Sequence, residues 1–464
     1  MSEASQRAGL LPFLVYAALS TAIVSSLGML LVPTISREMD VSVSTAQWML
    51  TVNLLVGAIA TPVMGRLSDG PHKKRLLLAS LMIILLGSII AALAPNFTVF
   101  LVGRALQGLT YGIVPVTIAL ARRYLPSAKV QFGISSLSVT VSTGIGIGYP
   151  LTGILAGTFD FRFAFWFAAL FVLTAIVVVI RAVPTGPDDR APRTSFDFVG
   201  AMLLGTGLGA LLVGVSEGPN WGWASPWTLA AFFVALIVLA VWTRVELQVA
   251  HPLINLRVLR NGDVLLANAT AIGLGAAMYV GLSIASLIAQ APESTGYGIA
   301  LPVLWAGFVM FPLSVGSFSA NRLVRRLSHR MNMSALLPFG AAVVTTSTTL
   351  IWLAHDELWE ILIGMLLFGV GIGTTYAAMP GLIERSVAAV ELGSAVSFNQ
   401  VLRTVGGSVG SAISGAVLAA HLGPDLHPTG HGIDLTLAIG AVGCALVFSG
   451  LMINRLSAQV ARVD

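Results

Sequence analysis

Long apolar segments separated by short polar connections dominate the pattern of this chain. Each segment is close to the roughly 20 apolar residues that a helix needs to cross the hydrocarbon core of a bilayer. The pattern therefore predicts fourteen membrane-spanning helices, with boundaries good to roughly 2–4 residues. The expected spans are 12–35, 46–67, 76–94, 98–121, 134–157, 163–182, 198–216, 226–245, 264–289, 299–319, 334–353, 359–380, 394–420 and 434–454.

The composition excludes most other classes of protein. Of the 464 residues, 56% are hydrophobic and only 10% are charged, whereas a soluble globular chain carries about 25% charged residues. An ordinary soluble protein and a disordered one are both excluded by that deficit. The single cysteine, Cys444, rules out an intramolecular disulfide and a cysteine-based metal site. The sequence indicates an all-α polytopic membrane protein.

The basic residues are distributed unevenly between the two sides of the predicted bundle. Connections on the side of the N-terminus carry 21 Lys and Arg residues, whereas the opposite side carries only Arg37 and Arg162. Because cytoplasmic connections hold the excess of Lys and Arg, both termini are expected in the cytoplasm. A net charge of +5 could indicate a nucleic-acid or acidic partner, but the basic residues lie in short clusters between apolar segments, so we expect no nucleic-acid partner.

Two long connections divide the chain. The segments 183–197 and 246–263 flank the seventh and eighth predicted spans. This predicts an N-terminal six-helix half at 1–185, an inserted helix pair at 186–250 and a C-terminal six-helix half at 251–464.

Internal repetition supports two related halves. The motif Gly-x-x-Tyr-x-x-x-Pro occurs around Tyr111 in the fourth span and around Tyr376 in the twelfth. The glycine-rich run 144–153 has a counterpart at 406–415. Parallel halves related about an axis along the membrane normal are a transporter architecture, with the substrate site between them.

With these features the chain resembles the major facilitator superfamily, and specifically its fourteen-helix drug:proton antiporter family, over nearly its whole length. Gly65, Asp69, Lys73 and Lys74 match the signature loop after the second helix, although Gly70 stands where arginine is usual. The resemblance implies that this loop locks the cytoplasmic ends of the halves together when the site faces outward. The alternative is a solvated turn.

Arg104 is the first of two arginines inside predicted spans. Arg104-x-x-Gln107-Gly108 resembles the family's fourth-helix motif, whose arginine is linked to proton translocation. A guanidinium inside the membrane costs several kcal/mol unless it faces protein or water, so it marks a functional residue by default. The alternative is that Arg104 extends to the outer interface.

The fifth span carries a motif associated with antiporters. Gly144, Gly148, Pro150 and Gly153 match it. Glycines four apart give a smooth face for helix packing, and the proline lets the helix bend. From physical reasoning alone, this face could serve only for helix packing and say nothing about the direction of transport. Only the resemblance to antiporters indicates export.

Polar and aromatic residues inside the spans are candidates for the substrate pathway, because such sites are mostly apolar with a few placed polar groups. Arg403 lies about nine residues into the thirteenth span, with Asn399 on the same helix face. The full set is Ser25, Asn53, Arg104, Gln107, Tyr111, Tyr149, Tyr279, Trp305, Tyr376, Asn399 and Arg403.

Carboxylates are missing from the central part of every predicted span. The family's first helix usually carries an aspartate, and the corresponding position here is Val24. The resemblance implies a proton gradient as the energy source, with Arg104 and Asp69 as coupling candidates, and no cofactor. No ATP-binding motif occurs. The histidines His421, His427 and His431 fall in a Gly- and Pro-containing connection, so we expect no metal site.

We therefore expect a multi-pass protein of a bacterial inner membrane that exports small amphiphilic molecules by alternating access, surrounded by lipid and functional as a monomer. The substrates would be drugs, antibiotics or secondary metabolites, and an enzyme is not expected. A solute uptake permease of the same fold and a lipid flippase are the alternatives. With Arg104 and Arg403 as the clear intramembrane charges, neutral or anionic amphiphiles should be preferred over quaternary ammonium dyes.

Overall fold

The computed structural model describes residues 9–41, 43–185, 196–327, 333–388, 391–423 and 427–460. Within these ranges the regular secondary structure is helical, apart from an isolated bridge between Leu422 and Pro428. The elements are α2 (Leu11–Ser26), η1 (Met29–Leu31), α3 (Val32–Glu38), α4 (Val43–Asp69), α5 (Lys73–Leu93), α6 (Phe97–Gln107), η2 (Gly108–Gly112), α7 (Ile113–Tyr124), α8 (Ser127–Thr158), α9 (Arg162–Ala182), α10 (Phe198–Trp221), α11 (Pro226–Gln248), η3 (Leu256–Arg260), α12 (Gly262–Gln290), η4 (Glu293–Thr295), α13 (Val303–Phe308), α14 (Phe311–Leu327), α15 (Met333–Leu353), α16 (Leu358–Ser386), α17 (Leu392–Ala420) and α18 (Gly430–Val460).

Twelve helical segments in the described ranges are long and apolar enough to cross a membrane. The other two expected spans, 12–35 and 299–319, coincide with interrupted helices. The first comprises α2, η1 and α3, and the second comprises α13 and α14. In both segments the sequence is apolar enough for a span, but the helix is interrupted. The apolar pattern continues through the interruption and therefore does not reveal it.

Local sequence fixes where several helices begin. The side chains of Asn96, Asp197 and Ser225 accept hydrogen bonds from backbone N–H groups at the starts of α6, α10 and α11. Glu357 and Glu360 form a reciprocal capping box at the start of α16. These contacts satisfy donors that the first turn of a helix leaves free. Glu360, near the end of a predicted span, therefore serves as a helix cap.

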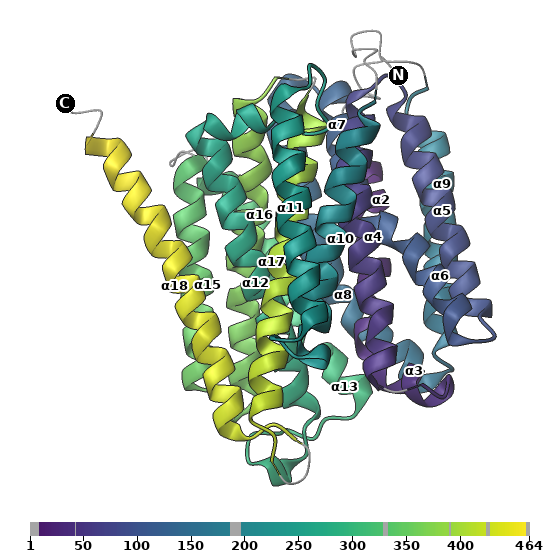
Figure 1. Ribbon diagram of the computed structural model, residues 1–464, viewed down its shortest axis with the longest axis vertical. Helices are drawn as coiled ribbons and strands as arrows, with labels where there is room; N and C mark the ends of the chain where they lie inside the picture. Colours follow the sequence, from purple (N-terminus) through teal and green to yellow (C-terminus); the bar gives the residue numbers. More distant parts are fainter. Residues whose placement is uncertain are drawn as a thin grey trace.

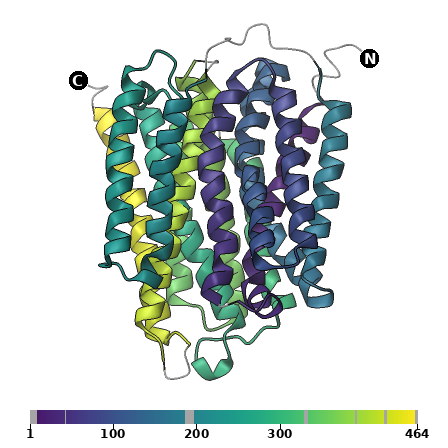
Figure 2. The same ribbon diagram turned by 45° about the vertical axis from the view of Figure 1, so that its right-hand side comes forward.

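The helices form two groups with a pair between them (Figure 1). We call α2–α9 the N-terminal helices and α12–α18 the C-terminal helices. Contacts between the groups run through α4 with α17, and through α8 with α13, α14 and α16. The helices α10 and α11 pack on each other, and α10 also packs on α4 and α17. Figure 2 shows the two groups side by side.

The helix α2 begins and α18 ends at the same end of the bundle, which we call the terminus-bearing end (Figures 1 and 2). The helix α4 ends there at Asp69, and α17 begins there at Leu392. The C-terminus of one helix therefore lies beside the N-terminus of its partner from the other group. This arrangement creates the first part of the candidate site.

Candidate functional site

A carboxylate at the end of α4 caps the beginning of α17. Asp69 Oδ1 accepts a hydrogen bond from the backbone N–H of Gly393 at 2.7 Å, and Oδ2 accepts one from the N–H of Ser394 at 3.0 Å. Glu391, the residue before α17, provides no side-chain cap. Asp69 fills that role from the other group of helices, and its negative charge faces the positive end of the helix dipole. We call this contact the clasp.

Two glycines allow α4 and α17 to approach closely enough for the clasp to form. A Cβ atom added to Gly65 would meet the side chain of Ser397 and, at 2.7 Å, the carbonyl oxygen of Gly393. A Cβ atom added to Gly393 would come within 2.6 Å of Gly65 O and of Asp69 Oδ1. Only glycine at both positions fits this contact between backbones.

The lysines of the signature loop donate to backbone oxygens within the N-terminal half of the chain. Lys73 Nζ donates to the backbone oxygen of Gly70 at 2.8 Å, and Lys74 Nζ donates to the carbonyl oxygens of Ile180, at 3.0 Å, and Val183. Lys74 therefore caps the end of α9, where a positive charge is favourable. Of the hydrogen bonds described here for Asp69, Lys73 and Lys74, only those of Asp69 join the N-terminal helices to the C-terminal helices.

Other contacts hold the groups together near the same end. Arg122 on α7 pairs with Glu384 on α16, with NH2 and Oε1 3.9 Å apart. Ser135 on α8 donates to the carbonyl oxygen of Ala377 on α16 at 3.1 Å. The terminus-bearing end is therefore closed across the interface between the groups.

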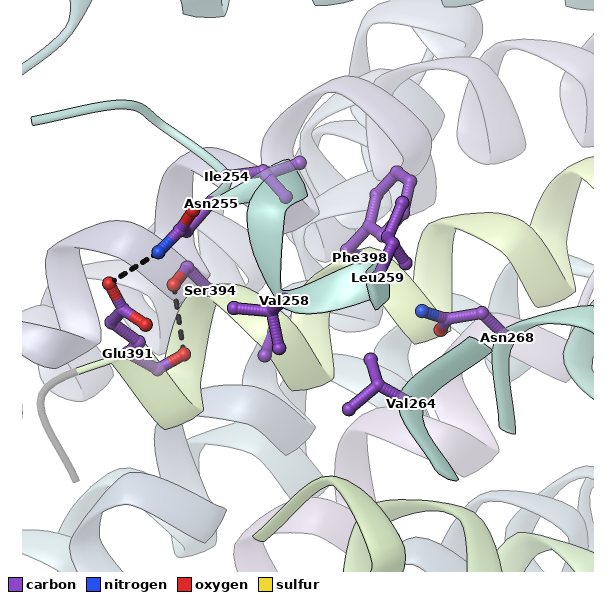
Figure 3. Close-up of a pocket in the computed structure, with 10 residues that line it drawn as sticks. Ile254, Asn255, Val258, Leu259, Val264, Asn268, Glu391, Ser394 and Phe398 are labelled. Atoms are coloured by element: carbon purple, nitrogen blue, oxygen red, sulfur yellow. Dashed lines mark hydrogen bonds between the residues drawn. The ribbon is translucent and has the colours of Figure 1, made fainter. Parts of the chain in front are cut away.

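A small pocket lies beside the clasp, between η3, α12 and α17 (Figure 3). Asn255 Nδ2 donates to Glu391 Oε1 at 2.8 Å on its wall. Ser394, which donates its backbone N–H to Asp69, also donates its hydroxyl to Glu391 O at 2.9 Å. These bonds connect the segment before α12 to the beginning of α17, which is the helix end that Asp69 caps. They therefore fix the position of the backbone N–H groups in the clasp.

Four tyrosines meet in the middle of the bundle, two from each group of helices. Tyr111 and Tyr149 come from the N-terminal helices, and Tyr279 and Tyr376 come from the C-terminal helices. The side chain of Tyr111 lies close to that of Tyr279, and Tyr279 also lies close to Tyr149 and Tyr376. Tyr149 and Tyr376 are buried, whereas Tyr111 and Tyr279 remain partly accessible. The structure thus brings all four tyrosines of the predicted pathway together.

Glycines make room for two of these rings in equivalent ways. A Cβ atom added to Gly57 on α4 would collide with the ring of Tyr111, and one added to Gly407 on α17 would collide with the ring of Tyr279. Each glycine belongs to the same group of helices as the ring it accommodates. The two groups therefore present matching aromatic surfaces to the interface.

Arg104 lies within the N-terminal helices, and its side chain is 1% exposed. Its Nε donates to the carbonyl oxygen of Met49 at 3.2 Å, and NH1 donates to Gln107 Oε1 at 2.6 Å. Gln107 Nε2 in turn donates to Ser88 Oγ at 2.9 Å. Asn53 donates to the carbonyl oxygen of Arg104 at 3.0 Å. Arg104 is held by this network and does not extend to the outer interface.

Arg403 on α17 lies on the other side of the tyrosines, and its side chain is 4% exposed. Its guanidinium carbon stands 4.4 Å from the centre of the Tyr376 ring. Within the described part of the chain, none of its three side-chain nitrogens donates a hydrogen bond. The two buried arginines therefore differ in how their charge is accommodated.

The antiporter-motif helix α8 packs on both groups. Cβ atoms added to Gly144 and Gly148 would meet Ala22 and Ser26 of α2. On another face, the backbone of Tyr149 and Pro150 faces Gly307 of α13. Gly153 is buried on the same helix. The motif glycines thus provide close packing within the N-terminal helices, while the helix itself spans the interface.

Three other predicted pathway residues lie outside the tyrosine cluster. Asn399 donates to Ala267 O at 3.1 Å and to Asn268 Oδ1 at 3.0 Å, where α17 packs on α12. Ser25 donates to the carbonyl oxygen of Ala22 on its own helix. Trp305 is 57% exposed on α13. Their polar or aromatic character gave no information on which face of the helix they occupy.

The sequence pattern did not single out one acidic pair. Glu246, near the end of α11, is 1% exposed and accepts a hydrogen bond from Trp242 Nε1 at 2.8 Å. The side chain of Asp197, at the start of α10, lies nearby, since a Cβ atom on Gly200 would meet both carboxylates. The sequence did contain a sign of this pair: Asp197 lies just before the seventh predicted span, and Glu246 lies just after the eighth.

Comparisons with known proteins identify the family of this chain. A model of the Major Facilitator Superfamily matches residues 13–411. The chain is 27% identical to the multidrug resistance protein Stp of Mycobacterium tuberculosis (strain ATCC 25618 / H37Rv) over 399 residues, covering 85% of the chain and 73% of that protein.

Two further relatives come from Streptomyces. The lincomycin resistance protein of Streptomyces lincolnensis is 25% identical, over 92% of the chain and 86% of that protein. The tetracenomycin C resistance and export protein of Streptomyces glaucescens is 25% identical, over 85% and 73%. Among solved structures, the human organic anion transporter MFSD10 shares the fold, with a TM-score of 0.70, 14% identity and coverage of 97% of the chain and 100% of that structure.

Proposed function

Since this chain belongs to the Major Facilitator Superfamily, we propose that it is a secondary-active exporter of small amphiphilic molecules that works by alternating access. Relatives that match most of this chain are named for resistance to several drugs or to single antibiotics, and one is named for export. Lincomycin and tetracenomycin C are therefore the first substrates to test.

The observation that carries this function is the clasp. In alternating access, two rigid groups of helices rock about a central site, so contacts between them at each end must form and break. The bonds from Asp69 to Gly393 and Ser394 connect the groups through one side chain and two backbone N–H groups. Such a contact separates without disrupting either helix.

The finer organisation belongs to the same proposal. We assign the chain to the fourteen-helix drug:proton antiporters, with the interrupted segments α2–α3 and α13–α14 as the first and tenth crossings. The halves would be 1–185 and 251–464, and the inserted pair 186–250. The excess of Lys and Arg supports a cytoplasmic terminus-bearing end in a bacterial inner membrane.

Proton coupling would act through the clasp. An ionised Asp69 accepts hydrogen bonds through both oxygens, whereas a protonated carboxyl has lost its charge and turned one oxygen into a donor. Binding of a proton would therefore weaken the attachment to Gly393 and Ser394 and favour opening of this end. Arg104 would contribute through Tyr111, whose side chain lies near it.

The experiment is drug export by everted membrane vesicles under an imposed proton gradient, after a growth-protection screen in a pump-deficient bacterial host. Asp69→Asn should lower export at least tenfold with protein abundance near normal, because the amide presents an N–H₂ group to an N–H donor. Asp160→Asn is the matched control, since Asp160 faces solvent beside Arg162 and should leave export unchanged. Wild-type export by Asp69→Asn would refute the role of the clasp, and uptake in place of export would identify a permease.

A further inference from the structure

The guanidinium of Arg403 is buried without the partners that such a group requires. Its Nε, NH1 and NH2 atoms are all inaccessible and lack an acceptor within the described ranges. Buried polar groups in native proteins are almost always hydrogen-bonded, and a buried charge needs a partner or costs several kcal/mol. An arginine kept in this condition indicates that its hydrogen-bonding capacity serves something other than the resting fold.

Nearby side chains offer Arg403 an aromatic surface and no counter-charge. Tyr376 stacks against the guanidinium, and its hydroxyl lies near the guanidinium without a hydrogen bond of good geometry to it and donates to Met278 Sδ at 3.2 Å. The buried carboxylates of the described residues are those of Asp69, Glu217 and Glu246. Each lies within five residues of a helix end, whereas Arg403 is twelfth in a helix of 29 residues. None of the described ion pairs includes Arg403.

Arg403 also lies next to the tyrosines at the interface between the groups. Tyr376 connects it to Tyr279, which interacts with Tyr111 of the N-terminal helices. Tyr111 and Tyr279 are the partly accessible members of this set. A molecule held between the two groups would meet these aromatic rings first and the guanidinium behind them.

We propose that Arg403 is an anion-binding subsite that receives the carboxylate, sulfonate or phosphate of an amphiphilic molecule whose apolar body lies against the central tyrosines. This inference rests on the proposed function and specifies its substrate class. A planar guanidinium forms two parallel, charge-assisted hydrogen bonds with such a group. The aromatic rings contribute apolar contact and hydroxyl groups.

A matched pair of probes separates the anion from the apolar body. 1-Anilinonaphthalene-8-sulfonate and N-phenyl-1-naphthylamine share one aromatic skeleton, and only the former carries a sulfonate. Equilibrium dialysis would measure the binding of each to full-length protein in phosphatidylcholine nanodiscs, with the signal of empty discs subtracted. Arg403→Gln should weaken saturable sulfonate binding at least tenfold and change binding of the neutral probe less than threefold.

Two variants keep the result interpretable. Arg403→Lys retains the charge and loses the paired donors, so sulfonate binding should fall between wild type and Arg403→Gln. Arg322→Gln removes an exposed arginine that also stacks on an aromatic ring, with its guanidinium carbon 5.5 Å from the centre of Phe318. It should change neither probe.

Three outcomes would refute the subsite. Equal weakening of the binding of both probes in Arg403→Gln would make Arg403 a packing residue. Unchanged sulfonate binding in Arg403→Gln, or no saturable sulfonate binding by wild type, would leave the guanidinium without an anionic ligand. Repeating the dialysis in phosphatidylglycerol discs distinguishes two sources of the anion. Competition by this lipid that depends on Arg403 would support the subsite and assign its occupant to a lipid phosphate.

Drug export distinguishes this inference from the proposed function. Export by wild type together with sulfonate binding that ignores Arg403 would refute the subsite and leave the exporter standing. Sulfonate binding that depends on Arg403, without export of any drug in the screen, would refute the exporter and leave the subsite standing.

Discussion

Arg104 and Arg403 are both buried beside the central tyrosines, one in each group of helices, yet their surroundings differ. Arg104 donates to Met49 O and to Gln107 Oε1, and Gln107 continues the network to Ser88. Arg403 stacks on Tyr376 and finds no acceptor among the described residues. The two arginines are alike in their burial, but they differ in their hydrogen-bond partners. Arg104 is therefore bound within its own group of helices, whereas the hydrogen-bonding capacity of Arg403 is left for the ligand that we propose.

The largest effect is expected from removing the satisfied arginine. Arg104→Met would leave Met49 O and Gln107 Oε1 buried without a donor, and each such loss costs about 1–3 kcal/mol. The variant also gives up the contact with the Phe165 ring, whose centre is 5.9 Å from the guanidinium carbon. Its melting temperature in detergent should fall by several degrees, with reduced yield. A melting temperature equal to that of wild type would remove the contrast between the two arginines.

The matched change on the other side should have the opposite sign. Arg403→Met removes a buried charge without stranding any acceptor within the described residues, and replacing such charges by apolar groups is often neutral or stabilising. Its melting temperature should equal or exceed that of wild type, while sulfonate binding is lost. A fall as large as that of Arg104→Met would show that Arg403 holds the fold together.

Two glutamines sharpen the comparison with a smaller effect. Gln107→Leu leaves Arg104 NH1 and Ser88 Oγ without their partner, so we expect a loss of about 1–3 kcal/mol, seen as a lower melting temperature. Gln400→Leu removes a side-chain oxygen that has no donor among the described residues, so its melting temperature should stay near wild type. Equal shifts for the two variants would indicate that Gln400 has a partner in solution.

The sequence predicted these features to different depths. Hydropathy located the helices because a span is a local property of about 20 residues. It did not detect the interruptions after Ser26 and after Phe308, where the apolar pattern continues. The signature loop singled out Asp69, but its partners, Gly393 and Ser394, lie more than 300 residues away along the chain. Both intramembrane arginines were evident as charges in apolar segments.

What the sequence could not supply is the surroundings of each side chain. Trp305 and Tyr376 are both aromatic residues inside apolar segments, yet one is exposed and the other stacks on Arg403. Which helix face is turned toward the interface depends on packing between distant segments. The distinction between a satisfied and an unsatisfied arginine is therefore a property of the folded chain alone.

Alternating access requires the two groups of helices to separate at the terminus-bearing end during each transport cycle. Toward this end Asn321 Nδ2 of α14 donates to Ser136 Oγ of α8 at 2.9 Å, so Ser136→Cys with Asn321→Cys, in a Cys444→Ala background, places two thiols across the interface between the groups. The decisive measurement is drug export by vesicles carrying this protein before oxidation, after oxidation and after reduction, beside each single-cysteine variant. We predict that oxidation stops export in the double variant alone and that reduction restores it; undiminished export by the cross-linked protein would contradict the account.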